Sequence, residues 1–342
     1  MDIKNEEFVL LDTCSYSNLM NGKWSKTEQK ACLKLLSGGN KPVISDLTFV
    51  ELVCGSRNLS EFNKLINDMK NGFILFGHQK NLKNITEYSY SKNIKNNNDL
   101  QEYKKRLLIE RNKIIKPIFC LMAFSYLRLF CIVLSLVSDL FRGKLIQMTN
   151  GICASGEPAF VTLLDEIFDG YINKEFESEN LFYELAVNMM TIYLKNNDKS
   201  FTDENIKKEI DKLKLPKNLT KLTSKFVKIF KASSSNSKSV KNMKTLNNIE
   251  LLLEFMGNQR RSIANKEQKG NKESELEMIA IDFCVINSGF CSGKFDFNDL
   301  VDIYNFAIIG NDENHFYYYT NEKKWQRFKD IISHKYSDLI NG

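Results

Sequence analysis

The sequence lacks several of the patterns that identify common enzyme classes. Its eight cysteines include no Cys-x-x-Cys pair, which argues against a zinc site built on paired cysteines and against a disulfide framework. Its three histidines, His78, His315 and His334, form no recognisable ligand or triad pattern, and no Gly-x-x-x-x-Gly-Lys motif for nucleotide phosphates occurs. These absences weaken the case for a zinc enzyme, a serine-type hydrolase or a nucleoside triphosphatase.

The start of the chain also lacks the apolar core behind a basic segment that marks a secretory signal. Because most of the cysteines lie in apolar runs, we expect them to be buried, reduced thiols. Both observations predict a cytoplasmic protein. The net charge of +6 is compatible with nucleic acid as a partner without requiring one.

A chain of 342 residues is longer than one average domain, and its hydrophobic content of 43% is sufficient for a packed core. Two modules, or one module with a large insertion, are the first expectations. Residues 84–100 are rich in Asn, Lys and Ser and open a long stretch of helical pattern, whereas both ends of the chain have an α/β pattern. We therefore expect a first part at residues 1–83, a mainly helical insertion at 84–274, and a second part at 275–342.

Two strands are predicted near the start of the chain, and a carboxylate lies after each of them. Residues 8–11 form an apolar run typical of a buried strand, and Asp12 ends it. In open α/β sheets ligands bind outside the carboxyl ends of the strands, so Asp12 indicates a site; a turn former or a helix N-cap is the alternative. Residues 42–45 form a second strand, and Glu51 lies on the helix after it, where it faces the same edge or is simply solvated.

The same pattern returns near the end of the chain. A helix predicted to open near residue 297 carries Asp299 in or near its first turn and Asp302 about one turn later on the same side. Such a pair can hold a hard cation or can simply favour the positive end of the helix. Residues 315–319 form a further strand, which Thr320 and Glu322 follow.

Acids that could form the site lie in four segments, which follow one another along the chain: Val9–Thr13, Ile44–Leu52 with Gly55 after it, Asn298–Leu300 and Tyr319–Glu322. In these segments and their order the chain resembles the PIN-domain family of metal-dependent nucleases. The resemblance implies an α/β fold, a PIN-like three-layer sandwich with a mainly parallel sheet, which the mostly helical insertion interrupts.

The resemblance also implies the site and its chemistry. The catalytic and metal-binding residues would be Asp12, Glu51, Asp299 and Glu322, with Asp302 as a further ligand and with Thr13 and Thr320 as hydrogen-bonding supports. Carboxylate ligands suit Mg²⁺ or Mn²⁺. The implied activity is that of a hydrolase, an endoribonuclease that cleaves RNA phosphodiester bonds through a metal-bound water. A toxin or defence effector would use such an activity, and a catalytically inactive scaffold that binds RNA or protein is the alternative.

Residues 206–244 are rich in lysine and poor in acids. The spacing of five lysines predicts that they lie along one helical face, where they would bind the phosphates of RNA in a salt-dependent way. A solvated lysine face is the alternative. The five lysines are Lys214, Lys217, Lys221, Lys225 and Lys228.

A regulatory protein partner that binds the helical insertion and an oligomer of the chain are two further open alternatives.

The apolar stretch at residues 118–141 is the candidate membrane span. Its polar residues fall within an arc of roughly 100° when wound as a helix, which favours a mostly buried helix with one polar stripe. A central arginine would also cost about 2.5–3.5 kcal/mol in a membrane. We therefore favour a core helix or a partner-binding helix over a membrane-associated effector. The polar residues are Ser125, Arg128, Ser135, Asp139 and Arg142.

Overall fold

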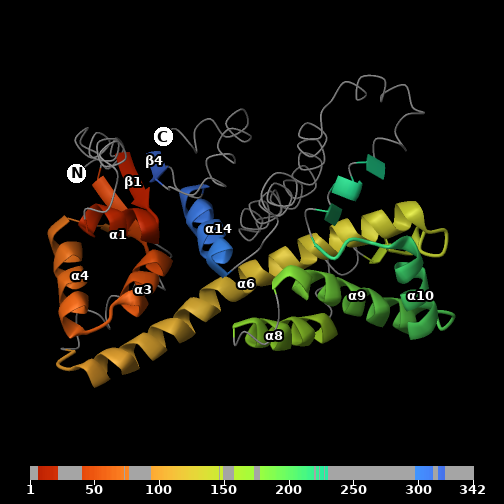
Figure 1. The fold of residues 1–342 in the computed structure, drawn as a ribbon, viewed down its shortest axis with the longest axis horizontal. Coiled ribbons are helices and arrows are strands. Elements are labelled where there is room, and N and C mark those ends of the chain that lie inside the picture. The colour runs from red at the N-terminus through yellow and green to blue at the C-terminus, as the bar shows by residue number, and fades with distance from the viewer. Residues whose placement is uncertain are drawn as a thin grey trace. The chain divides into compact units, whose positions relative to one another are not determined.

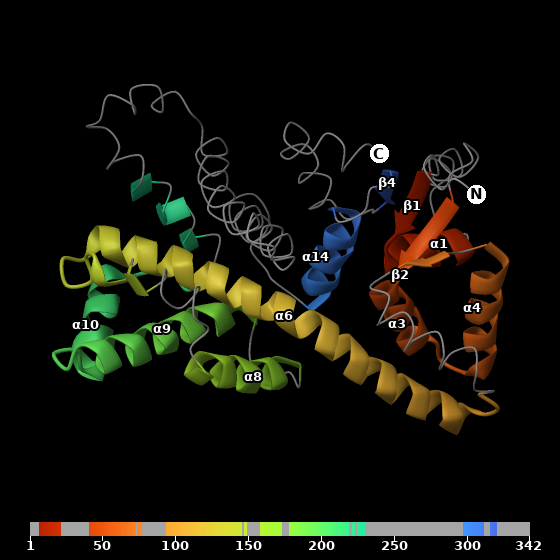
Figure 2. The same cartoon turned by 180° about the vertical axis from the view of Figure 1, so that it is seen from behind.

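A computed structural model describes residues 7–21, 41–72, 74–76, 94–145, 147–148, 158–172, 178–218, 221–222, 224–226, 228–229, 297–310 and 315–319. The chain divides into two compact units (Figures 1 and 2). Residues Met1–Ile115 and Leu300–Gly342 form one, here called the α/β unit, and Lys116–Asp299 form the other, the helical unit. The described residues are mostly helical with a small parallel sheet, so the fold is α/β.

The sheet of the α/β unit has four parallel strands in the order β3-β2-β1-β4. β1 pairs with β4 from Glu7 opposite His315 to Leu11 opposite Tyr319, which joins the two ends of the sequence. Val9, Leu10 and Leu11 have no exposed surface, as expected for a strand of a parallel sheet. Three strands lie where the sequence predicted them: β1 at Glu7–Leu11, β2 at Lys41–Ser45 and β4 at His315–Tyr319. The fourth, β3, is the short strand Ile74–Phe76.

Helices follow the strands because parallel neighbours need crossover connections. One of these helices, α4, was missed by the sequence analysis. The Asn58 side chain accepts the Glu61 N–H at the start of α4, and buried apolar residues repeat at helical spacing along it. The helices are α1 (Thr13–Asn21), α3 (Asp46–Gly55), α4 (Leu59–Gly72), α14 (Phe297–Gly310) and the first part of α6 (Asn97–Val137).

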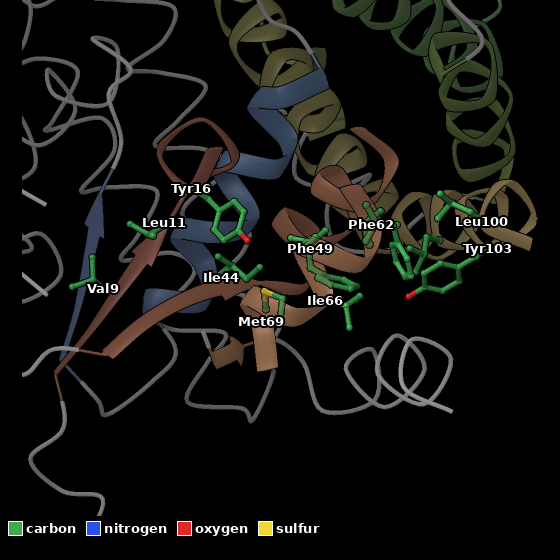
Figure 3. Close-up of a cluster of buried hydrophobic side chains, with 14 residues drawn as sticks. Val9, Leu11, Tyr16, Ile44, Phe49, Phe62, Ile66, Met69, Leu100 and Tyr103 are labelled. Atoms are coloured by element: carbon green, nitrogen blue, oxygen red, sulfur yellow. The ribbon is translucent and has the colours of Figure 1, made fainter. Parts of the chain in front are cut away.

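The core of the α/β unit joins its sheet to these helices (Figure 3). Phe62 on α4 and Tyr103 on α6 meet edge to face, with ring centroids 5.9 Å apart. The start of α6 therefore belongs to this core. The labelled members of the cluster are Val9, Leu11, Tyr16, Ile44, Phe49, Phe62, Ile66, Met69, Leu100 and Tyr103.

The later part of α6 is the core helix of the helical unit. The Phe119 ring lies 5.3 Å from the Phe168 ring and 5.6 Å from the Phe182 ring, measured between centroids. By length and composition α6 is apolar enough to cross a membrane, yet more than half of its most apolar stretch is buried inside the protein. These contacts fit a core helix. The structure also describes α8 (Pro158–Ile172), α9 (Ser178–Asn197) and α10 (Asp203–Leu213) in this unit.

The predicted polar stripe on α6 is wrong in its second half. α6 ends at Val137, so Asp139 and Arg142 lie in the turn that follows, where they are exposed and form an ion pair at 2.9 Å. Gly143 adopts a positive φ of 79° in this turn, a conformation that glycine tolerates better than other residues. Ser135, within the helix, is buried.

The prediction of buried thiols is correct for Cys131 and wrong for Cys14. Cys14 is exposed because it lies in the first turn of α1, on the side away from the buried Ser15 and Tyr16. Cys54 and Cys120 are partly buried, and burial raises the pKa of both thiols.

Candidate active site

Asp12 follows β1 at the edge of the sheet where the parallel strands end. The strand order reverses at β1, because β2 and β3 lie on one side of it and β4 lies on the other. In open α/β sheets ligands bind outside the carboxyl ends of the strands at such a reversal. The topology therefore puts Asp12 at the position where a ligand is most expected.

Asp12 also serves as the N-cap of α1, the alternative role that the sequence suggested. Its Oδ1 accepts the Ser15 backbone N–H at 2.5 Å, and its carbonyl oxygen accepts the Tyr16 N–H at 2.9 Å. The side chain is 7% exposed. Capping uses one of two carboxylate oxygens and holds the group in one orientation, so capping and ligand binding are compatible.

A hydrogen bond connects α1 to α3 beside Asp12. The Thr13 hydroxyl donates to Oε2 of Glu51, which is partly buried. β1 and β2 pair in parallel with Leu10 opposite Val43, so the helices that follow them begin at the same edge of the sheet. The structure thus brings together three of the predicted site residues, Asp12, Thr13 and Glu51.

Asp46, which the sequence analysis did not single out, is a fully buried acid that directly follows β2 but does not cap α3. Ser45 caps α3 instead, since its hydroxyl oxygen accepts the Thr48 N–H at 3.0 Å. The Asp46 carboxylate accepts the Leu47 N–H at 2.9 Å and the Tyr304 hydroxyl at 3.0 Å. Burial raises the pKa of Asp46 to about 6, although both hydrogen bonds act in the opposite direction. The Tyr304 bond holds α3 against α14.

The two acids of α14 lie at the expected positions on the helix. Asp299 is in the first turn and Asp302 follows one turn later on the same side. Asp299 is fully buried and Asp302 is 7% exposed. Asn305, three residues further along, is also buried, and its Oδ1 has no hydrogen-bond partner in the part of the chain that the structure describes. α14 therefore carries a buried polar stripe.

The chemistry of these side chains fits Mg²⁺ or Mn²⁺, because all of them offer oxygen atoms. Two buried oxygens without hydrogen-bond partners among the described residues, in Ser15 and Asn305, lie on the helices that carry the proposed acids. Within the described ranges, no three His, Cys, Asp or Glu side chains come close enough to hold a metal together. Mg²⁺ commonly binds one or two carboxylates and completes its shell with water and substrate phosphate. An ion held here by one or two carboxylates would take its remaining ligands from water and substrate.

The five lysines predicted to share one helical face do not share a helix. α10 ends at Leu213, and Lys214 follows in the left-handed region with a φ of 47°. Pro216 then interrupts the helical pattern, since proline lacks the N–H and restricts the residue before it. Lys225 is partly buried and donates to the Leu213 carbonyl at 3.0 Å. The exposed lysines are Lys214, Lys217, Lys221 and Lys228.

Two predicted site residues, Thr320 and Glu322, lie outside the described residues, as do parts of the segments 84–100 and 206–244. The residues that sequence reasoning missed are Asp46 and Tyr304. Asp46 had a usable signal, because it follows β2 as directly as Asp12 follows β1. Tyr304 had none, because its partner lies in a distant part of the chain.

Comparison with known proteins leaves the family of this chain open. No family model, no curated protein and no solved structure matches it. The likeness to PIN domains therefore depends on the four sequence segments that carry the acids.

Proposed function

We propose that the α/β unit is a PIN-like endoribonuclease that hydrolyses RNA with the help of bound Mg²⁺ or Mn²⁺. The observation that carries this proposal is the position of Asp12 at the reversal of the strand order, together with the hydrogen bond from the next residue, Thr13, to Glu51. Two oriented carboxylates at this edge suit a hard cation that also contacts phosphate. The finer fold assignment, a three-layer sandwich interrupted by the helical insertion, is part of the same proposal.

The proposed metal-binding acids are Asp12 and Glu51, with Asp299, Asp302 and Glu322 as further candidates. When bound, the ion would activate a water molecule and stabilise charge on the phosphate oxygens. The chain itself supplies orientation, because the Ser15 N–H holds Asp12 and the Thr13 hydroxyl holds Glu51. Burial of Asp12 strengthens its interactions with cations, since buried charges are screened less than exposed ones.

The helical unit is the proposed second contact for RNA. Lysine side chains attract phosphates in a salt-dependent and sequence-independent way. The exposed lysines after α10 are suitable because few dissolved ions screen them from a polyanion at low salt. Lys225 contributes less than the others, because its Nζ is engaged by the Leu213 carbonyl. The candidates remain Lys214, Lys217, Lys221, Lys225 and Lys228.

The test is cleavage of a mixed RNA pool in Mn²⁺, Mg²⁺ or EDTA. Asp12→Asn, Glu51→Gln and Asp299→Asn should each lose more than about 100-fold in rate, the upper cost of removing a supporting hydrogen bond from a metal site. Thr13→Val removes such a support and should cost about 10- to 100-fold. Glu166→Gln, an exposed acid on α8, is the matched control and should cleave normally. Metal-dependent cleavage that survives in Asp12→Asn and Glu51→Gln would overturn the proposed site.

A binding scaffold with an inactive site is the alternative function. A scaffold predicts that the wild-type chain retains RNA on a filter, cleaves none in any metal, and binds equally well as Asp12→Asn. Cleavage of RNA by the wild type but not by Asp12→Asn would exclude the inactive scaffold.

A further inference from the structure

The first part of α6 packs along α3, the helix that carries Glu51. Tyr103 and Leu107 of α6 belong to the same buried cluster as Val50 and Val53 of α3. Lys104, which is only 9% exposed, donates from Nζ to the carbonyl oxygen of Ser56 at the end of α3. One face of α6 is therefore fixed against α3.

Helical spacing puts Arg111 on that same face. Lys104, Leu107 and Arg111 are three and four residues apart, which aligns their side chains along one side of a helix. Arg111 is partly buried and lies close enough to Cys54 and Glu51 for both groups to influence its pKa. Cys54 lies one turn after Glu51 on α3. The side of α6 that carries Lys104 and Arg111 therefore runs along α3 from its end at Ser56 back to Glu51.

Arg111 differs from the other basic residues near it. Arg106 and Lys113 are exposed, and each pairs at 2.7 Å with an acid of its own helix. Arg111 instead turns inward, where burial lowers the pKa of its guanidinium while Cys54 and Glu51 raise it. A cation that is partly removed from water is stabilised by anions. Glu51 supplies one such anion, and a phosphate of RNA bound at the proposed site would supply another.

We propose that Arg111 binds a backbone phosphate of the RNA beside Glu51 and so positions the substrate. This inference rests on the proposed nuclease function. The planar guanidinium suits the role, because its parallel N–H groups match two phosphate oxygens, whereas an ammonium group offers only a point charge. Arg111 thus makes the helix that opens the insertion a part of the site.

Binding and cleavage by full-length variants test this assignment. With fluorescein-labelled, mixed-sequence single-stranded RNA in Ca²⁺, Arg111→Gln should lower the slope of log affinity against log salt by about 0.7, the value for one lost phosphate contact. Its KM in Mg²⁺ or Mn²⁺ should rise about 10- to 100-fold, as for loss of a charged hydrogen bond. Arg111→Lys should keep the salt slope and recover part of the KM.

Lys113→Gln is the matched control, because it removes an exposed charge two residues away on the same helix. It should leave KM unchanged. The assignment is overturned if Arg111→Gln matches wild type in KM and salt slope, or if Lys113→Gln produces the same changes. If Arg111→Gln does not fold, as judged by circular dichroism, the KM of folded Arg111→Lys decides, and a wild-type KM there also overturns it.

The two proposals can fail separately. If the wild-type chain cleaves RNA and Arg111→Gln behaves like it, the nuclease proposal stands and Arg111 is not part of the site. If the chain never cleaves RNA but Arg111→Gln loses one phosphate contact, Arg111 remains an RNA-binding residue and the nuclease proposal fails.

Discussion

The two units differ in the kind of polar group that they bury. The α/β unit buries the acids Asp12, Asp46 and Asp302 together with Lys104. In the described part of the helical unit, the buried polar side chains are the hydroxyls of Ser135 and Ser138, apart from Asp299 at the unit's boundary. Buried charge is costly and clusters at functional sites. The contrast agrees with the site that we propose in the α/β unit, whereas the helical unit is held by apolar and aromatic packing.

The largest expected effect is a loss of stability when the aromatic core of the helical unit is truncated. Phe119→Ala should destabilise the protein by about 3–5 kcal/mol, because it removes a fully buried ring from contact with Phe168 and Phe182. Urea unfolding followed by circular dichroism measures the shift of the transition. Since chains with two units need not unfold in one step, the transition of the helical unit is the relevant one.

Ile109→Ala is the control on the same helix. Ile109 is 55% exposed, so its truncation should change stability by no more than about 0.5 kcal/mol. If Phe119→Ala were no more destabilising than Ile109→Ala, the later part of α6 would not be a core helix. The membrane-associated alternative would then regain support, and fractionation of cells would test it.

The next effect concerns the buried charge of the α/β unit. Because burial raises the pKa of Asp46 to about 6, the folded chain binds more protons than the unfolded chain between pH values of about 4 and 6. Stability should therefore fall as pH rises through this window, by at most about 3 kcal/mol for a shift of roughly two pH units.

Asp46→Asn should remove this part of the pH dependence, because asparagine still accepts the Tyr304 hydroxyl but does not titrate. The measurement is the difference in urea stability between wild type and Asp46→Asn at a series of pH values. Glu166→Gln, at an exposed acid, should leave the wild-type profile intact. A difference between wild type and Asp46→Asn that does not vary with pH would show that Asp46 has an ordinary pKa.

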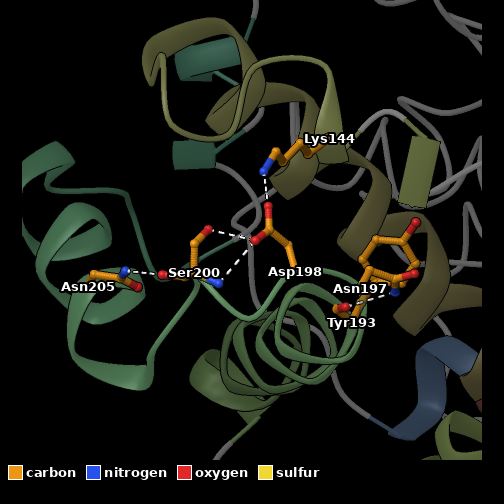
Figure 4. A network of polar contacts seen from close by, with 6 residues as sticks. All are labelled: Lys144, Tyr193, Asn197, Asp198, Ser200 and Asn205. Carbon is orange, nitrogen blue, oxygen red and sulfur yellow. Dashed lines mark hydrogen bonds and ion pairs between the residues drawn. The ribbon is translucent and has the colours of Figure 1, made fainter.

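The smallest effect is expected at the exposed polar network of the helical unit (Figure 4). Lys144 and Ser200 hydrogen-bond to Asp198 and lower the pKa of its carboxyl group. Water competes with such exposed interactions, so Asp198→Asn should leave the urea transition of the helical unit unchanged within error. The Lys144 ammonium also keeps its contact with the Phe201 ring, 4.6 Å from the centroid. Clear destabilisation would mean that exposed polar contacts, and not only packing, stabilise this unit.

Sequence reasoning located the strands and several of the acids because the signals are local. A strand of a parallel sheet is buried on both faces, so residues 8–11 appear as an apolar run that Asp12 ends. The spacing of Asp299 and Asp302 likewise follows from helix geometry. The lysine face failed because the pattern was extended across Pro216, beyond the end of α10.

By itself the sequence determined which segments become strands and helices and which acids stand at their ends. Only the tertiary structure decided the strand order with β4 beside β1, the contact of Thr13 with Glu51 and that of Asp46 with Tyr304, and the approach of Arg111 to Glu51. The physical reason is that the spacing of apolar residues determines which face of a helix or strand is buried. The hydrophobic effect is not directional, so the spacing does not specify which other element packs against that face.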